Sequence, residues 1–462
     1  MKIHQFYTAC LAQASYYIDS DGVAAVVDPL RDVDTYLEMA NQNNATIRYV
    51  LVTHFHADFV SGHIELADRT GAEIVFGPEA TPGYPAHIAT QNEELPLGSC
   101  SIRVLHTPGH TIESACFLLS DEKGNPNAVF TGDTLFVGDV GRPDLLSGNL
   151  DANELASRLY DSVKNQLAPL PDHVIVYPGH GAGSACGKDL GSANQTTIGE
   201  QRSYNPAFVQ TKEAFVSGIV EGQPLAPSYF FKDAMINKQG YEHLDTVLQR
   251  SRKPLSVDAF EQEITLGATI LDTRKVTYPS HKIICGSLYI GLDGQFAIWA
   301  GALVPFDKPL VLVCDPGTEE EVITRLSRIG YDRCVGYLEN GMEAWEAKGG
   351  AVSMIFSIKE EVVSEHMIDG QPVYFLDVRK PSEFETGHVS GAVHVPLDQL
   401  TSKIPLLDKE RCYAVYCAGG YRSLIAVSLL LKENFKCVYN IIGGFEAIRS
   451  GFSLPVNHEV IQ

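Results

Sequence analysis

The sequence predicts a protein of several domains, in which α/β and α+β parts follow one another along one chain. Its 462 residues exceed what one hydrophobic core holds, and a guide of about 150 residues per domain suggests three domains. In the first part, short apolar runs alternate with amphipathic segments, and the remainder contains an internal repeat. We therefore predict one large domain over 1–250 and two small α/β domains over 251–353 and 354–462.

The first domain is predicted to alternate strands and helices. Apolar runs bounded by Gly, Pro or Asp predict strands over 24–27, 49–52, 73–76, 102–105, 128–131 and 174–177. Mixed polar and apolar segments predict helices over 33–42, 64–70 and 152–166, and a further helix over 205–222 that begins at Pro206.

The second half of the chain repeats itself. The motif LDTRK at 271–275 returns as LDVRK at 376–380, and GMEAW at 341–345 returns as GFEAI at 444–448. A repeat on this scale indicates two copies of one small α/β domain and not a solenoid.

Composition and charge argue against several classes of partner. The net charge of −22 argues against nucleic acid or an anionic membrane as the main partner. The longest apolar stretch, 296–306, is shorter than the ~20 residues of a membrane helix, and the N-terminus has no secretory apolar segment. Ten cysteines are scattered over the chain, which predicts reduced thiols in a cytoplasmic protein.

Four motifs in the first domain carry residues that bind metals. They are HFHAD at 54–58, HTPGH at 106–110, TGDT at 131–134 and PGHG at 178–181, and each follows an apolar run. Strand ends deliver such side chains into a common site, so the set predicts a metal centre. Taken singly, any of these histidines could instead cap a strand.

The four motifs, in this order, resemble the metallo-β-lactamase fold over about residues 1–245. The resemblance implies an αβ/βα sandwich with metal at one edge of its sheets. In the binuclear hydrolases of that superfamily, a further histidine follows the aspartate and binds a second ion. Here that position is Phe59, which coordinates nothing, so we expect a single metal ion.

The domain is also similar to the persulfide dioxygenases of this superfamily. That resemblance implies that His54, His110 and Asp133 bind one Fe(II) per chain, with zinc as the alternative. Two imidazoles and one carboxylate on a face of the ion, with further positions open, are the arrangement of non-haem Fe(II) oxygenases.

Other polar residues near these motifs have two interpretations each. His56, Asp58 and His180 would orient the ligands from behind or serve as alternative ligands. Arg142 would bind the carboxylate or phosphate of a thiol substrate, or form a structural pair with a nearby aspartate. Cys186 would hold or relay a persulfide near the metal, or be a buried, inert thiol.

The last domain contains YCAGGYRS at 416–423, directly before a predicted helix over 424–431. A strand, tight loop and helix start direct backbone amides and the positive helix end toward one sulfur, an environment that favours thiolates and bound anions. That sulfur belongs to Cys417, and Arg422 adds a fixed positive charge. The remaining loop residues are Ala418, Gly419, Gly420, Tyr421 and Ser423.

With LDVR and GHVSGA upstream, this part resembles a catalytic rhodanese domain. The resemblance implies that Cys417 carries sulfane sulfur as a persulfide, while a phosphate-handling or scaffold role is the alternative. In the middle copy Cys314 corresponds to Cys417, but Glu319 stands where Arg422 stands. Like charges raise a thiol pKa and repel anions, so we expect a degenerate copy without activity.

Together the resemblances imply oxidation of a low-molecular-weight thiol persulfide by dioxygen to sulfite. The last domain would pass sulfane sulfur to sulfite, forming thiosulfate, or run in reverse. The expected partners are small molecules, without nucleic acid or membrane, and a homodimer fits the architecture. The alternatives are a glyoxalase II or lactamase-type hydrolase of a thioester or lactone, and a non-catalytic persulfide carrier or sensor. The identity of the thiol carrier and the direction of transfer stay open, as does participation of Cys314 or Cys186.

Overall fold

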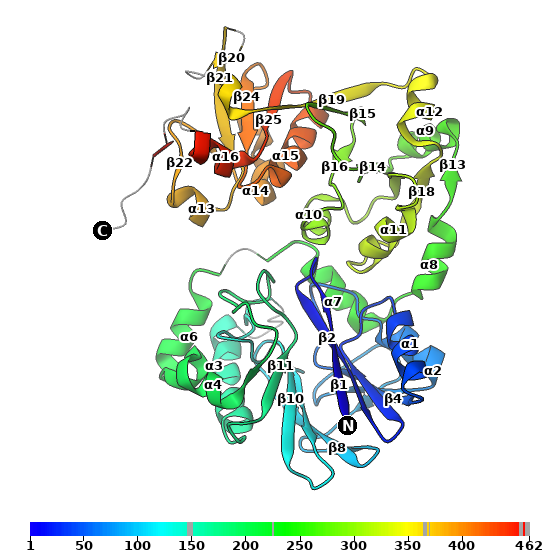
Figure 1. The fold of residues 1–462 in the computed structure, drawn as a ribbon, viewed down its shortest axis with the longest axis vertical. Coiled ribbons are helices and arrows are strands. Elements are labelled where there is room, and N and C mark those ends of the chain that lie inside the picture. Colours follow the sequence, from blue (N-terminus) through cyan, green and yellow to red (C-terminus); the bar gives the residue numbers. More distant parts are fainter. Residues whose placement is uncertain (146–150, 224–225, 364–366, 369, 452–455, 458–462) are drawn as a thin grey trace. The chain divides into compact units, whose positions relative to one another are not determined.

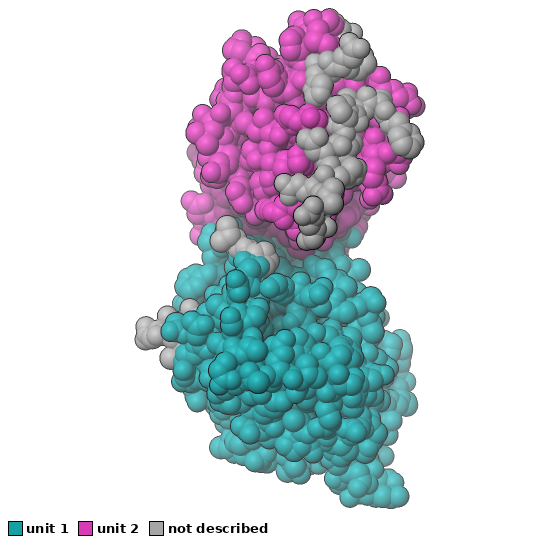
Figure 2. Space-filling view, turned by 90° about the vertical axis from the view of Figure 1, so that its left-hand side faces the viewer, with its two compact units in different colours: residues 1–247, 324–331 teal, residues 248–323, 332–462 magenta. Residues whose placement is uncertain are grey.

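The chain forms two compact units in the computed structural model, which describes residues 1–145, 151–223, 226–363, 367–368, 370–451 and 456–457. The first unit consists of residues 1–247 and 324–331, and the second of residues 248–323 and 332–462 (Figure 2).

Two six-stranded sheets make the centre of the first unit (Figure 1). The first has the order β1 (Lys2–Thr8), β2 (Gln13–Ser20), β3 (Val23–Val27), β4 (Thr46–Val52), β5 (Glu73–Phe76), β6 (His87–Ile88). The second has the order β12 (Thr196–Thr197), β11 (Ile175–Pro178), β10 (Pro126–Gly132), β9 (Ala115–Ser120), β8 (Cys100–His106), β7 (Glu94–Leu97). Inner-face side chains of both sheets, including Tyr16, Val27, Val104 and Phe117, form one buried core between them.

Helices cover the outer faces of both sheets. Helices α1 (Asp34–Gln42) and α2 (His63–Thr70) bury Tyr36 and Leu66 against the first sheet. The second sheet is covered by α3 (Ala152–Ser162), its π-helical continuation (Val163–Leu167), α4 (Ile198–Tyr204), α5 (Pro206–Val209) and α6 (Lys212–Val220). Helices α7 (Phe230–Gln239) and α8 (Leu244–Ser251) follow. The predicted αβ/βα sandwich is therefore confirmed.

One predicted helix is wrong, since the segment 205–222 forms two helices. Asn205 caps α5 by accepting from the Ala207 amide, and Thr211 caps α6 by accepting from the Ala214 amide. Because each segment has its own N-cap, the chain leaves the helical path between them. Pro206 marks the start of the first helix only, and Thr211 marks the start of the second, which the single predicted helix did not include.

The second unit contains two α/β copies. The middle copy has a parallel sheet ordered β13 (Pro254–Leu255), β18 (Cys334–Leu338), β17 (Leu310–Val313), β14 (Thr269–Asp272), β16 (Leu288–Tyr289). Its helices are α9 (Val257–Thr265), α10 (Phe296–Leu303), α11 (Glu319–Ser327) and α12 (Gly341–Ala347). The last four residues of α11 and the turn after it belong to the first unit.

The last copy is built on a seven-stranded sheet, ordered β15 (Ser280–Ile284), β19 (Val352–Ile358), β25 (Cys437–Ile441), β24 (Cys412–Tyr416), β21 (Gln371–Asp377), β20 (Met367–Ile368), with β23 (Val393–His394) beside β21. Its helices are α13 (Pro381–Glu385), α14 (Leu397–Lys403), α15 (Tyr421–Lys432) and α16 (Gly444–Gly451), and β22 (His388–Val389) pairs with β26 (Val456–Asn457). Strand β15 comes from the chain segment of the middle copy and pairs antiparallel with β19.

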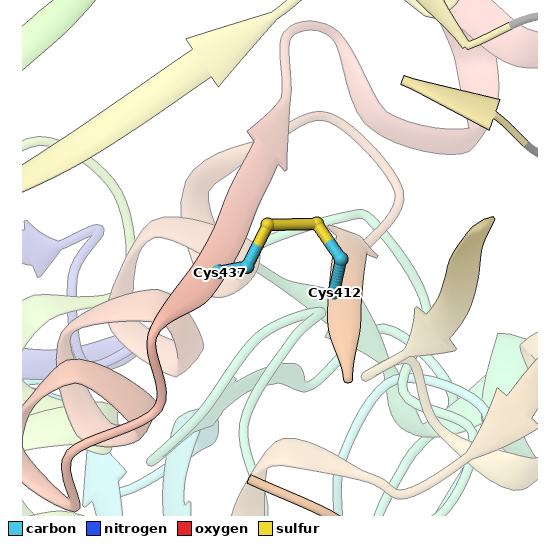
Figure 3. The surroundings of a disulfide bond; sticks show 2 residues. All are labelled: Cys412 and Cys437. Atoms are coloured by element: carbon cyan, nitrogen blue, oxygen red, sulfur yellow. A yellow bond between two sulfur atoms is a disulfide. The ribbon is translucent and has the colours of Figure 1, made fainter. Parts of the chain in front are cut away.

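A disulfide joins Cys412 and Cys437, which corrects the expectation that all cysteines are reduced (Figure 3). The two residues are register partners on the neighbouring parallel strands β24 and β25, with their Cα atoms 4.5 Å apart. Cysteine spacing along the chain does not reveal this pairing across the sheet, which is why the sequence argument missed it. Among the described residues, no helix is both long enough and apolar enough to cross a membrane.

Candidate metal centre and cysteine loop

Four loops of the first unit carry the predicted metal-binding residues. His54 follows β4, His110 follows β8, Asp133 follows β10 and His180 follows β11. Strands β3, β4 and β5 run parallel, as do β10 and β11, so the loops that follow them leave at one edge of each sheet. The loop residues, far apart in the sequence, thereby come together.

His54, His110 and Asp133 form one cluster, in which one donor atom of each residue lies within 4.8 Å of the others. His110 Nε2 is 3.4 Å and His54 Nε2 is 3.9 Å from the same carboxylate oxygen, Asp133 Oδ2. All three side chains are buried. The structure thus brings together the residues for which the sequence predicts iron binding, and the binding itself stays a prediction.

Hydrogen bonds at the other ring nitrogen orient two of the histidines. His110 Nδ1 lies 2.8 Å from the carbonyl oxygen of Arg142, and His180 Nδ1 lies 3.2 Å from that of Ala12. An N–H at Nδ1 donates to these carbonyls, which leaves each Nε2 free to bind a cation. Burial and the neighbouring histidines lower the pKa of His54 well below its usual range, which favours a neutral His54 ring.

Several buried atoms here have no hydrogen-bond partner among the described residues. They include both carboxylate oxygens of Asp133, Asp58 Oδ1 and His180 Nε2. A buried carboxylate without a partner is costly, and buried charges are ordinarily paired or bind metals. The donor set therefore fits the metal that the fold implies.

His56 is paired behind this site. Its Nε2 lies 3.0 Å from Asp28 Oδ1, and the same carboxylate accepts hydrogen bonds from the amide and hydroxyl of Thr53. Burial opposes protonation of His56, but Asp28 outweighs it and raises the His56 pKa. Phe59 is fully buried, with its ring centroid 4.3 Å from that of His56, and so forms an apolar wall.

Glycines allow the loops to approach the ligands. A Cβ at Gly179 would lie 2.7 Å from Asp133 Oδ1, and one at Gly141 would lie 2.9 Å from His110 Nδ1. Any side chain at either position would displace a candidate ligand. This is the physical reason for the glycines in the PGHG and DVGRPD segments.

Asp58, His180 and Cys186 form a second cluster, again with one donor atom of each within 4.8 Å of the others. His180 Nε2 is 3.4 Å from Asp58 Oδ2 and 3.5 Å from Asp133 Oδ1, so the Asp133 carboxylate faces both clusters. Burial, together with the carboxylates of Asp58 and Asp133, raises the pKa of Cys186 well above its usual range. The structure places Cys186 at the site, and its role as a persulfide carrier stays a prediction.

Arg142 is buried and holds the loops together. Its guanidinium makes two hydrogen bonds of 2.7 Å to Asp144 and a longer one of 3.4 Å to the carbonyl of Ala185. Its amide donates to the carbonyl of Cys186 at 3.0 Å. This geometry is that of the structural pair, and substrate binding by Arg142 stays a prediction.

Two residues of the site were missed by the sequence analysis. Asn237 on α7 donates from Nδ2 to the carbonyls of His56 and Phe59 at 2.8 and 2.7 Å, and so fixes the HFHADF loop. Tyr229 is buried, and burial together with Asp58 raises its pKa well above the usual range. Nothing in the sequence signals these contacts, because both residues lie far along the chain from the loop.

The predicted cysteine loop lies between β24 and α15. Cys417 is buried, its sulfur accepts from the Gly420 amide at 3.1 Å, and the Ser423 hydroxyl lies 3.5 Å away. Gly420 has φ +102°, a left-handed conformation that favours glycine. The Tyr421 hydroxyl donates to the carbonyl of Gly291. A backbone amide of the predicted loop, that of Gly420, thus points toward the Cys417 sulfur.

Arg422 has a partner that the sequence analysis did not identify. Its two terminal nitrogens each donate to Glu383 at 2.7 Å, in a bidentate pair at the start of α13. Burial opposes ionisation of Glu383, but the hydrogen bonds from Arg422 prevail and lower its pKa. The fixed charge beside Cys417 is therefore positioned by a carboxylate.

The middle copy lacks this environment. Cys314 is buried and contacts the Thr273 hydroxyl at 3.6 Å. Burial raises the pKa of Cys314 far above its usual range, and the charges of Glu319 and Asp272 add to the effect. The charge of Glu319 acts in the expected direction but is a smaller cause than burial, and the inactivity of the middle copy stays a prediction.

Comparison with known proteins matches these parts to two families. The metallo-beta-lactamase superfamily matches residues 8–180, and the rhodanese-like domain matches residues 256–348 and 360–450.

Individual relatives match most of their own length. A crystal structure of a metallo-beta-lactamase from Staphylococcus aureus subsp. aureus COL is 31% identical, with a TM-score of 0.64, and the match covers 73% of this chain and 98% of that one. The cytoplasmic hydroxyacylglutathione hydrolase of Arabidopsis thaliana is 35% identical over 185 residues, 39% of this chain and 67% of that protein. ETHE1 from Myxococcus xanthus is 30% identical, with a TM-score of 0.44, over 52% of this chain and 98% of that one.

The two family models and the Staphylococcus aureus structure agree with the sandwich and the two α/β copies described above. The chain belongs to the metallo-β-lactamase superfamily, with a glyoxalase II-like domain followed by two rhodanese-like domains.

Proposed function

We propose that the protein oxidises a low-molecular-weight thiol persulfide with dioxygen and couples this reaction to sulfane-sulfur transfer. The observation that carries the proposal is the buried cluster of His54, His110 and Asp133, on one chain with a cysteine loop of the rhodanese type. In the oxidation, one persulfide, one dioxygen and one water give sulfite, the free thiol and two protons. The terminal sulfur loses four electrons and dioxygen gains them.

The first unit would hold one Fe(II) through His54, His110 and Asp133. When bound, the metal supplies a redox couple and open positions for substrate and dioxygen. The protein's part is to fix the ligands, since the Arg142 carbonyl holds His110 Nδ1 and the Thr53 hydroxyl lies 2.9 Å from His54 Nδ1. The buried ring of Phe59 excludes water from one side.

The last copy would move sulfur through Cys417. The Cys417 thiolate attacks the terminal sulfur of a persulfide, forming an S–S bond while the thiolate of the donor leaves. Sulfite then attacks that sulfur, thiosulfate departs and the Cys417 thiolate returns, or the steps run in reverse. The Gly420 amide and Arg422 would stabilise the anionic persulfide.

The test begins with anaerobically purified protein, with metal analysis and an oxygen electrode. We expect one iron per chain and oxygen uptake only when glutathione persulfide is added. Removing the metal with a chelator should abolish uptake, and Fe(II) but not Zn²⁺ should restore it. Thioester cleavage without oxygen uptake would contradict the proposal.

A metal-dependent hydrolase is the second candidate function, with zinc as its metal. It is favoured by the cytoplasmic hydroxyacylglutathione hydrolase relative at 35% identity. The metal, held by the same residues, would then supply a Lewis acid for hydrolysis of a thioester or lactone in place of oxidation. The same preparation, given a glutathione thioester in place of persulfide, separates the two functions, because only a hydrolase would cleave the thioester. A non-catalytic carrier or sensor would neither cleave the thioester nor consume oxygen with persulfide.

The partners in this proposal are small molecules: thiol persulfide, dioxygen, sulfite and thiosulfate. A homodimer, absence of nucleic acid or membrane partners, and a cytoplasmic location are part of the same proposal. Disulfides are rare in reducing compartments, so the Cys412–Cys437 bond is the feature by which the proposed cytoplasmic location can be tested. Alkylation of unfolded protein from rapidly quenched cells, before and after reduction, would show whether this bond forms where the protein works.

A further inference from the structure

The segment 324–331 is part of the middle copy in sequence, yet its contacts place it in the first unit. It consists of the end of α11 and the turn that follows, and the side chains of Leu326, Ile329 and Tyr331 are buried. Burial raises the pKa of Tyr331, and the nearby charge of Asp233 on α7 adds to the effect. The first unit is therefore built in part from residues of the copy that follows it.

The turn after α11 contacts the loop that carries the first predicted metal ligand. The Arg328 carbonyl accepts a hydrogen bond of 2.7 Å from the amide of Val60, at the end of the HFHADF loop. Val60 is fully buried, and the ring of its neighbour Phe59 packs against that of His56. Because a buried amide needs a partner, the Arg328 carbonyl helps to fix this end of the loop.

The Arg328 side chain contacts a second loop that supports the same site. Its Nε and one terminal nitrogen donate to the two carboxylate oxygens of Asp32 at 2.9 and 2.8 Å. Asp32 lies after β3, in the same loop as Asp28, the carboxylate that pairs behind the metal site. Arg31 of this loop donates in turn to the carbonyl of Ser327 at 2.9 Å. Side chains from both segments thus join the loop to the end of α11.

The two loops are also joined to each other. Leu30 and Ser61 form an antiparallel β-bridge. The Pro29 carbonyl accepts hydrogen bonds from the Gly62 amide at 2.8 Å and the Ser61 hydroxyl at 3.0 Å. Displacement of one loop would therefore move the other, and Arg328 contacts both, through its carbonyl and its guanidinium.

We propose that Arg328 is a positioning residue of the metal centre, supplied to it by the middle rhodanese-like copy. Its carbonyl holds the loop that carries His54, and its guanidinium holds the loop that carries Asp28, so both loops keep one arrangement around the metal ligands. The inference rests on the metal centre of the proposed function but not on the reaction that the metal supports. It also gives the middle copy a role that does not require a reactive Cys314.

The experiment uses full-length, metal-free protein titrated anaerobically with up to one equivalent of Co²⁺, whose visible absorption reports the geometry of its ligands. The first variant is Arg328→Gln, which removes the charge and the two-point contact with Asp32. We expect its Co²⁺ affinity to fall about 10-fold, in the range for losing a residue that orients a ligand. The absorption band of the bound ion should also shift, whereas a role in stability alone would leave the band of the loaded protein unchanged.

Further variants test the same pair from other directions. Asp32→Asn should reproduce both changes, and because the two residues contact each other, the double variant should lose little more affinity than either single one. Arg328→Lys keeps the charge but not the two-point geometry, so it should recover part of the affinity. The matched control is Arg333→Gln, at an exposed arginine of the same copy that donates to the Asp307 carbonyl, and it should bind Co²⁺ like the parent.

Hydrogen exchange of the metal-free protein supplies a readout that needs no metal. The Val60 amide should exchange faster in Arg328→Gln and Asp32→Asn than in the parent, because its carbonyl partner is less firmly held. In Arg333→Gln it should exchange at the parent rate. If Arg328→Gln does not fold, Asp32→Asn and Arg328→Lys carry the same comparison.

Parent-like Co²⁺ affinity and absorption of folded Arg328→Gln would overturn the proposal, and so would an equal loss in Arg333→Gln. A parent that binds no Co²⁺ would overturn it as well. Oxygen uptake with persulfide is measured separately on iron-loaded protein. If uptake is absent while Co²⁺ binding and Val60 exchange respond as expected, the proposed oxidation fails and the positioning role of Arg328 is retained.

Discussion

The two rhodanese-like copies keep the same supporting pair and differ in the loop that it supports. Arg379 forms a bidentate pair with Asp377 and donates to the Gly387 carbonyl at 2.6 Å. In the middle copy Arg274 pairs with Asp272 in the same way and donates to the carbonyl of Lys282 at 2.6 Å. The pair is buried in the last copy, and in the middle copy Asp272 is buried and Arg274 partly buried, so both copies retain the interaction that fixes the end of the strand.

The cysteine loops have diverged. Gly420 directs its amide to the Cys417 sulfur, and Arg422 stands beside it. Cys314 instead meets the Thr273 hydroxyl and lies near Glu319. The difference teaches that both copies keep the Asp–Arg pair with their shared fold, whereas only the last copy keeps the loop that the proposed sulfur transfer would use.

The largest expected difference between the copies follows from removing each cysteine. Cys417→Ser should lower thiosulfate formation at least ~10³-fold, because the nucleophile is gone, while Cys314→Ser should leave it unchanged. Sulfite-dependent thiosulfate production measures both variants. Oxygen uptake should survive in both, and its loss with Cys417→Ser would contradict the division of roles between the units.

The Cys412–Cys437 disulfide should stabilise the last copy against unfolding, and the middle copy has no such bond at the corresponding position. It closes a segment of 25 residues in the last copy, and the chain-entropy account gives such a crosslink roughly 3 kcal/mol of unfolding free energy. In the middle copy the register partner of Cys334 is Leu310, so that copy has no counterpart at this position. Denaturant unfolding with and without reductant tests this. Reduction should destabilise the parent but not Cys437→Ser, and equal responses would refute the contribution.

The two cysteine loops also differ in charge, because the last copy has Arg422 where the middle copy has Glu319. Arg422→Gln should lower sulfur transfer by about 30-fold, since a hydrogen bond to a charged group is worth about 2 kcal/mol. Steady-state rates against sulfite concentration measure this loss. The matched change Glu319→Gln in the middle copy should have no effect, and a comparable loss there would show that the middle copy takes part in transfer.

The smallest effect concerns the pH dependence of the Arg422–Glu383 pair. The pKa of Glu383 in the folded protein is lowered, so the pair stabilises fully above the ordinary carboxyl pKa of ~4.3. The stabilisation is lost as the pH falls through the lower, folded value. Because the pair is partly exposed, we expect no more than ~1 kcal/mol. Unfolding free energies of the parent and Glu383→Gln should converge below pH ~4, and a constant difference would contradict this assignment.

The sequence predicted those parts of the molecule that local chemistry determines. The alternating pattern of the first domain led to most of the strands, and motif residues such as His54, His110 and Asp133 meet as expected because each follows a strand. Side-chain contacts between residues far apart in the sequence could not be predicted from local motifs. Neither the pairing of Glu383 with Arg422 nor the support of the HFHADF loop by Asn237 leaves a signal in the residues nearby.

The pairing of β15 with β19 has a consequence for anyone who isolates the last copy. A fragment beginning at residue 354 would cut β19 and remove its antiparallel neighbour. Its new edge would present unsatisfied amides and carbonyls, together with the exposed Phe356 side chain, to other chains. Such a fragment is expected to self-associate, so soluble expression should require a start before Ser280.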